Sequence, residues 1–435
     1  MPVAGSVVGA PETPQSLPDR QVGPCAAPSD PGEDGRSVWP SVLILPLDQL
    51  VYAATNFLPV LLLAQVSTAD SFGRLALSQG FIVALAVLGR AYFGTPLVAQ
   101  REPISALVLR TRLRQAAVVG AIGLAGMLAM STASSLPLAD PMDILMLGAG
   151  LPFAFLVEVF RSYFVTVRHE LVTLAVDVVW LAAQAATVIL GYLVGFQMIS
   201  VAKILWSVGA AISGLMAILL LSLLQRGKNV RNGSAPSRAV SRGFLVEAAL
   251  LAARINGYYL ILAIVAGYSM QGSIRYAVAL TAPVNTAFIG LRTFLTRCAV
   301  YRGSLSPRLI AGSLGLGVVL VVFGVAIPAS VVDAIDGDTS ADRVFIYVAA
   351  AVALTGIDII AQSLFAAGQQ LTSLRLARVF EVGAWFAAAS AGREGEPGRT
   401  GAALLMAATA STVMWVALWQ RGRVRARCLG EDAAL

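Results

Sequence analysis

Three arginines stand within long apolar runs of this 435-residue chain, namely Arg90, Arg254 and Arg292. Counted along a helix from the inner end of its run, each lies about 15 Å deep. A guanidinium group keeps its charge in a low dielectric and binds phosphate through paired hydrogen bonds. Arg90 and Arg292 have no acid within two turns on their own runs. We therefore expect these two to line a cavity that binds an anion.

Other arginines have an acid close by. Glu158 stands three residues before Arg161, which lies nearer the inner surface, and Glu247 stands seven residues before Arg254. Residues three or four apart share one face of a helix, so an ion pair is the plain alternative to substrate binding for Arg161. Both arginines stay candidates for substrate binding.

Six acids lie within the apolar runs: Asp48, Glu158, Asp177, Glu247, Asp358 and Glu381. An ionisable group at that depth either pairs with a base or marks an ion pathway. The role of counter-ion is favoured for Glu158 and Glu247. The candidates for binding a coupling H⁺ or Na⁺ are Asp48, Asp358, Asp177 and Glu158.

Hydropathy predicts the elements that carry these residues. The chain is 57% hydrophobic and 13% charged, with a mean hydropathy of +0.77, far from the values of soluble domains. About 20 apolar residues cross a bilayer as a helix. The predicted fold class is an all-α membrane protein with about twelve transmembrane helices, near 41–66, 74–98, 115–138, 143–165, 173–195, 200–224, 245–268, 275–297, 309–332, 344–368, 374–390 and 401–420.

The second half of the chain repeats the first. The aligned pairs are Arg74 with Arg275 and Gly89 with Gly290 at an offset of 201, Asn56 with Asn256 at 200, and Arg90 with Arg292 at 202. Six helices per repeat make the two halves parallel bundles, related by an axis along the membrane normal. Asn56 and Asn256 would offer hydrogen bonds to sugar hydroxyls in a cavity between the bundles.

Five segments follow from this pattern. They are a disordered cytoplasmic tail (1–40), an N-terminal six-helix bundle (41–225), a basic cytoplasmic linker (226–244), a C-terminal six-helix bundle (245–420) and a basic cytoplasmic tail (421–435). With the N-terminus inside, the inner loops and the C-terminal tail hold 19 Lys and Arg, against about six outside. The positive-inside rule therefore predicts that both termini are cytoplasmic.

The remaining composition argues against other classes. The net charge of +7 lies in loops between apolar spans, which does not favour nucleic acid as a partner. Cys25, Cys298 and Cys428 show no disulfide or metal spacing. No catalytic constellation or phosphate-cradling glycine loop appears, so the sequence predicts no enzyme and no cofactor.

Three motifs in the first two spans resemble a known family. DQxxxxxTNFLxxLLLA begins at Asp48, SFGRxALSQ at Ser71 and LGRAYFGTPLV at Leu88, and RSYFVTVRHELVTLAVDVVWLAAQ follows from Arg161. Together they are similar to the O-antigen and lipid-linked oligosaccharide flippases of the multidrug/oligosaccharidyl-lipid/polysaccharide (MOP) exporter superfamily. The resemblance implies two parallel six-helix bundles, a cationic cavity and alternating access. The residues at matching motif positions are Asp48, Asn56, Arg90, Arg161 and Asp177.

These observations predict a transporter that moves a lipid-linked oligosaccharide or polysaccharide precursor across the cytoplasmic membrane, with arginines on its phosphate headgroup. The alternative is a proton- or cation-coupled drug antiporter of the same superfamily, which should need acids more than arginines in its cavity. The loop QREPISALVLRTRLR lacks the motif expected of a major-facilitator transporter. The expected partners are membrane lipid, the lipid-linked glycan, H⁺ or Na⁺ and polysaccharide-biosynthesis enzymes.

Overall fold

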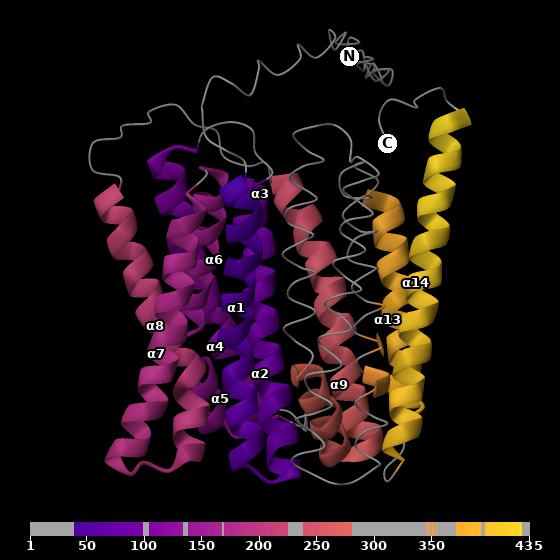
Figure 1. Cartoon of the computed structure of the whole chain (residues 1–435), viewed down its shortest axis with the longest axis horizontal. Helices are drawn as coiled ribbons and strands as arrows, with labels where there is room; N and C mark the ends of the chain where they lie inside the picture. The colour runs from indigo at the N-terminus through magenta and orange to yellow at the C-terminus, as the bar shows by residue number, and fades with distance from the viewer. Residues whose placement is uncertain are drawn as a thin grey trace, which may run out of the picture. The chain divides into compact units, whose positions relative to one another are not determined.

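The computed structural model describes residues 39–98, 104–133, 138–167, 169–224, 238–280, 371–392 and 396–428, and a few positions between 346 and 354. All regular elements in these ranges are helices (Figure 1). Two residues predicted for the site, Arg292 and Asp358, lie outside the described residues. So do the predicted span 309–332 and most of 344–368.

The N-terminal half is a series of helices. They are α1 (Trp39–Val66), α2 (Ala69–Gly89), the π-helix η1 (Arg90–Gly94), α3 (Thr95–Val98), α4 (Ala106–Ala133), α5 (Pro141–Gly148), α6 (Leu151–Thr166), α7 (Glu170–Val194) and α8 (Met198–Leu224). Local chemistry explains several ends. Thr68 caps α2 by accepting a hydrogen bond from the Ser71 amide, and α7 ends at Gly195, whose φ of 78° suits glycine.

Helix α6 lies at the centre of the N-terminal half. It packs against α4, α7, α8 and η1. The span formed by α5 and α6, Pro141–Thr166, is the most buried of the candidate spans in the described residues. Lipid tails are as apolar as a protein core, so close packing and hydrogen bonds hold such helices together. The charged residues of α6, Glu158 and Arg161, are buried among the other helices.

The C-terminal half is described in part. It contains α9 (Arg238–Leu280), α13 (Leu371–Ser390) and α14 (Pro397–Cys428), with α13 packed against both of the others. Helix α9 breaks at Gly267, where φ is 82° and ψ is 165°, a conformation that essentially only glycine adopts. Its first residue, Arg238, lies inside the predicted linker 226–244, so helix begins earlier than the basic, small-residue composition of that segment suggested.

Helix α2 packs closely against α9 after its break. A methyl group on Gly73 would clash with the Tyr268 carbonyl oxygen, and one on Gly80 would lie 3.0 Å from Arg275 Nη2. Residues later in α2 thus meet residues later in α9, so the two segments run in the same direction. Parallel repeats would produce this arrangement. The repeat itself stays a prediction, because much of the second half lies outside the described residues.

Eight helical stretches in the described residues are long and apolar enough to cross a membrane. Six correspond to the first six predicted spans, Ser241–Ala279 covers the seventh and the start of the eighth, and Gly398–Leu418 corresponds to the twelfth. Helix α13, predicted as the eleventh span, carries Arg375, Arg378 and Glu381 and is not among the eight. The eighth predicted span starts too late, at residue 275, because helix resumes directly after Gly267.

Candidate functional site

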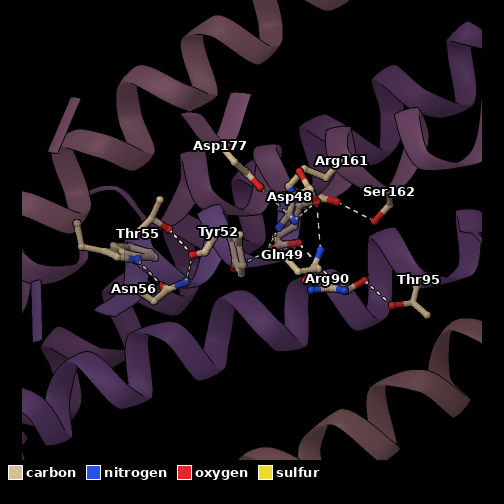
Figure 2. A network of polar contacts seen from close by, with 12 residues as sticks. Asp48, Gln49, Tyr52, Thr55, Asn56, Arg90, Thr95, Arg161, Ser162 and Asp177 are labelled. Carbon is tan, nitrogen blue, oxygen red and sulfur yellow. Dashed lines mark hydrogen bonds and ion pairs between the residues drawn. The ribbon is translucent and has the colours of Figure 1, made fainter. Parts of the chain in front are cut away.

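A buried cluster of three acids surrounds Arg161 in the N-terminal half (Figure 2). The Arg161 Nη2 atom lies 2.7 Å from Asp48 Oδ2 and 3.1 Å from Asp177 Oδ2. Its Nη1 atom lies 3.8 Å from Glu158 Oε1. The three carboxylates are at most 2% exposed, and Arg161 is 5% exposed. One guanidinium thus joins α1, α6 and α7 deep in the protein.

Arg90 reaches the same cluster from η1. Its Nε atom lies 3.8 Å from Glu158 Oε2, and 31% of its side chain is exposed. The π-turn forms where Pro96 cannot continue the helical hydrogen bonds, and the Thr95 amide donates to the Arg90 carbonyl. Gly94 brings η1 against α6, since a methyl group there would clash with Ser162 Oγ. The sequence RAYFGTP therefore places one cation at the edge of the cluster.

Tyr52 covers the cluster on the side of α1. Its hydroxyl donates a 2.5 Å hydrogen bond to Glu158 Oε1, and the Arg161 guanidinium lies 4.1 Å from the centre of its ring. Asp48 Oδ1 and Asp177 Oδ1 accept no hydrogen bond. With all groups ionised, three carboxylates face two guanidiniums. The cluster therefore contains one carboxylate more than it has guanidiniums, and it has free carboxylate oxygens that could bind a cation.

A second polar layer continues along α1. Asn56 Oδ1 accepts a 3.0 Å hydrogen bond from Trp206 Nε1, and Asn56 Nδ2 donates to the Tyr52 carbonyl. The Trp206 ring lies 5.7 Å from that of Trp180, which meets the Tyr52 ring edge-on at 6.1 Å. Both polar ends of Asn56 are thus engaged among the N-terminal helices. Its predicted role as a sugar ligand stays a prediction.

The C-terminal half holds a second buried ion network. Glu381 on α13 accepts hydrogen bonds of 2.6 Å from Arg254 on α9 and from Arg378. Arg378 also lies 3.7 Å from Glu247. The Arg254 guanidinium lies 4.9 Å from the centre of the Trp385 ring. The sequence spacing offers Glu247 as a counter-ion for Arg254; in the structure, Arg254 donates to Glu381, a residue 127 positions away.

The charged residues that were predicted for the site and lie in the described ranges divide into two groups. Asp48, Arg161, Glu158 and Asp177 lie together, and Arg90 joins them at their edge. Arg254 belongs to the network of the other half. The substrate roles of Arg161 and Arg254 stay predictions, because the structure shows each of them in ion pairs with buried carboxylates.

Sequence reasoning missed two members of these networks. Tyr52 follows Asp48 by four residues and so shares its helix face, a signal that was available. Arg378 precedes Glu381 by three residues, again on one face. In the part of the chain that the structure describes, no group of three or more His, Cys, Asp and Glu side chains could hold a metal ion.

Comparison with solved structures identifies the fold. The chain is similar to a MATE protein in complex with MaL6 (TM-score 0.62, 13% identity, covering 90% of this chain and 97% of that one). It is also similar to a MOP superfamily transporter from Pyrococcus furiosus whose binding pocket is described as having reverse polarity (TM-score 0.61, 13% identity, 89% and 96% covered). A third similar structure is a multidrug resistance MATE family transporter in an outward-facing conformation (TM-score 0.58, 12% identity, 89% and 96% covered).

No family model and no curated protein matches the chain. The likeness to solved structures therefore shows the fold alone, the all-helical membrane fold of MATE transporters of the MOP superfamily. The predicted fold class, an all-α multi-pass membrane protein, is confirmed.

Proposed function

We propose that the chain is a cation-coupled membrane transporter, in which the cluster of Asp48, Glu158 and Asp177 binds the coupling cation, either H⁺ or a Na⁺ held by one or two of these carboxylates. The observation that carries this proposal is the excess of one buried carboxylate over the two guanidiniums of Arg161 and Arg90. A buried, unbalanced charge is costly, and binding one cation removes the imbalance. Because this cluster holds more acids than arginines, it favours a drug antiporter over a transporter whose cavity is purely cationic.

The position of the cluster offers a way to couple ion binding to movement. Arg161 on α6 holds Asp48 on α1 and Asp177 on α7 through one nitrogen. A cation bound by Asp48 or Asp177 competes with the Arg161 nitrogen for that carboxylate. The contact of α6 with α1 or with α7 then weakens. The relative stability of two helix arrangements then depends on ion occupancy, which is the requirement for coupling.

Similar solved structures support alternating access as the mechanism. A multidrug resistance MATE family transporter has been solved in outward-facing and in inward-facing conformations, and this chain is similar to both (TM-scores 0.58 and 0.54). We infer that the two halves of this chain also alternate between the sides of the cytoplasmic membrane. The loop charges favour an orientation with both termini in the cytoplasm.

The substrate has two candidate classes. A small drug-like molecule agrees with the name of the multidrug resistance transporter above. A lipid-linked oligosaccharide or polysaccharide precursor is favoured by Arg90, because this arginine is 31% exposed and lies 3.8 Å from its nearest acid. Such a cation can still bind a phosphate headgroup. In that case polysaccharide-biosynthesis enzymes would supply the substrate.

Reconstitution into liposomes tests the coupling. Purified protein is sealed in vesicles with a pH-sensitive dye inside, and ethidium or a fluorescent short-chain polyprenyl pyrophosphate is added under a pH or Na⁺ gradient. We expect gradient-driven movement of one probe, lost in Asp177→Asn. The control is Asp143→Asn, since Asp143 pairs with Lys203 at 2.6 Å in the same half but outside the cluster. Wild-type transport by the Asp48→Asn, Asp177→Asn double variant would refute the proposal.

A further inference from the structure

Arg275 is a cation inside a membrane span. It lies in the span Ser241–Ala279, and no carboxylate of the described residues is within ion-pair distance of it. Its guanidinium lies 4.6 Å from the centre of the Tyr259 ring. A cation–π contact offsets only part of what an arginine loses when it leaves water. Arg275 is only half-buried, so its guanidinium remains accessible to a ligand.

The position of Arg275 was not evident from the sequence. The predicted eighth span began at residue 275 and left this arginine in an outer loop. In the structure helix resumes after Gly267, and Arg275 Nη2 lies against Gly80 of α2. Gly80 is about 11 residues, or about 16 Å, into the span that begins at Ala69. Arg275 therefore lies near the middle of the membrane, where α2 meets α9.

Two amide side chains, Asn256 and Gln271, lie with Arg275 against α2. A methyl group on Gly80 would lie 2.8 Å from Asn256 Oδ1 and 3.0 Å from Arg275 Nη2, so both atoms point at the same spot on α2. Gln271, one turn before Arg275, is fully buried, and neither its amide nitrogen nor its oxygen has a hydrogen-bond partner. Buried amides are normally satisfied. These groups form a site that α2 closes.

We propose that Arg275 binds an oxyanion, a phosphate or a carboxylate, of the transported molecule when α2 and α9 separate, with Asn256 and Gln271 binding its hydroxyl groups. This inference rests on the proposed transport function and names the substrate class, an anionic molecule that carries hydroxyls. Guanidinium supplies two parallel donors to an oxyanion, and the amides supply both donors and acceptors to a sugar.

The site is separate from the proposed coupling site and opposite in charge. The cluster around Arg161 lies among α1, α6 and α7 and has an excess of carboxylate. Arg275 lies on α9 and faces α2. A cation and an anionic substrate would thus bind to different groups, so neither needs to displace the other directly.

Calorimetric titration of the purified full-length protein in a maltoside detergent tests the proposal. The probes are two pairs that differ by one oxyanion: farnesyl pyrophosphate with farnesol, and octyl glucuronide with octyl glucoside below micelle-forming concentrations. Tetraphenylphosphonium represents a lipophilic cation. We expect at least one anionic probe to bind at least tenfold more tightly than its neutral partner. Comparison of the pyrophosphate pair with the glucuronide pair shows whether the site binds a phosphate or a carboxylate.

Three variants connect that binding to the site. Arg275→Gln should weaken the anionic probe at least tenfold, and Arg275→Lys should recover part of the loss. Asn256→Asp changes no volume but places a carboxylate beside Arg275, so it should weaken the same probe even if Arg275→Gln folds poorly. The control is Arg74→Gln, at the arginine that the predicted repeat aligns with Arg275; Arg74 is half exposed and pairs with Asp70.

The proposal is overturned if no anionic probe binds better than its neutral partner. It is also overturned if both Arg275→Gln and Asn256→Asp bind the anionic probe with wild-type affinity. A third contradicting result is tight binding of tetraphenylphosphonium that becomes tighter in Arg275→Gln. The coupling proposal has separate readouts, the Asp48 and Asp177 variants. A negative result at Arg275 with a positive one at Asp177 would therefore reject the anion site and keep cation coupling.

Discussion

Arg161 on α6 and Asp48 on α1 lie 113 residues apart in the sequence and 2.7 Å apart in the structure. Both side chains are almost fully buried. A buried pair contributes little net stability compared with apolar residues of the same volume, but removing one member leaves a charge with no counter-ion. Substitutions at the pair of Arg161 and Asp48, which the transport proposal uses, should therefore also change the free energy of unfolding.

Replacing Arg161 by Met should destabilise the protein by about 3–5 kcal/mol, because three buried carboxylates lose their shared partner. Thermal unfolding in detergent measures the destabilisation. Arg74→Met is the control, with an expected effect of at most about 1 kcal/mol, because Arg74 and Asp70 form an exposed pair. Equal effects of the two variants would contradict the assignment.

The C-terminal network should respond in the same way. Glu381→Gln removes the carboxylate shared by Arg254 and Arg378, and we expect a loss of about 3 kcal/mol. Glu396→Gln is the matched control, because the pair of Glu396 with Arg399 is about half exposed. A Glu381→Gln variant as stable as the control would show that this network is not an important support of α13 against α9.

The close approach of α2 and α9 should depend on glycine. Gly73→Ala places a methyl group against the Tyr268 carbonyl, which is backbone and cannot rotate away, so about 1–3 kcal/mol of stability should be lost. Gly126→Ala on α4 meets nothing within 4 Å and should be neutral or stabilise by up to about 1 kcal/mol. Thermal unfolding of both variants makes the comparison, and a neutral Gly73→Ala would argue against this packing.

Orientation can be checked with the native thiols. Cys25 and Cys428 are both predicted to lie in the cytoplasm, because basic residues concentrate on that side. An impermeant thiol reagent added to intact cells should leave both unmodified, and permeabilised cells should allow labelling. Modification of either cysteine in intact cells would overturn the predicted topology.

The sequence predicted the helices well because each span is a local property. About 20 apolar residues between polar turns are enough to indicate a span, and the first six agree with the structure. It also predicted the pair of Glu158 with Arg161, three residues apart on one helix. Boundaries near Gly267 failed, because a break inside a continuous apolar run depends on one residue's backbone conformation.

The partners that join different helices could not be predicted. Asp48, Arg161 and Asp177 were each candidates, but only the packing of α1, α6 and α7 brings them onto one guanidinium. Arg90 was expected to lack an acid, since none stands near it on its own helix, yet Glu158 approaches it from α6. Hydrophobic periodicity shows which face of a helix a residue occupies, but it does not show which residues of other helices lie opposite that face.

The central claim is that the cluster of Asp48, Glu158 and Asp177 binds a cation, and intrinsic fluorescence tests it most directly. Trp180 contacts Tyr52, which is hydrogen-bonded to Glu158, so its emission should report on the state of the cluster. Purified protein without substrate is titrated with acid and, separately, with NaCl at constant ionic strength. Trp180→Phe identifies the signal of this tryptophan.

We expect a saturable change in emission with H⁺ or with Na⁺, absent from the Asp48→Asn, Asp177→Asn double variant and retained in Asp143→Asn. A change that persists unaltered in the double variant, or a wild-type protein that responds to neither cation, would contradict the proposed coupling site.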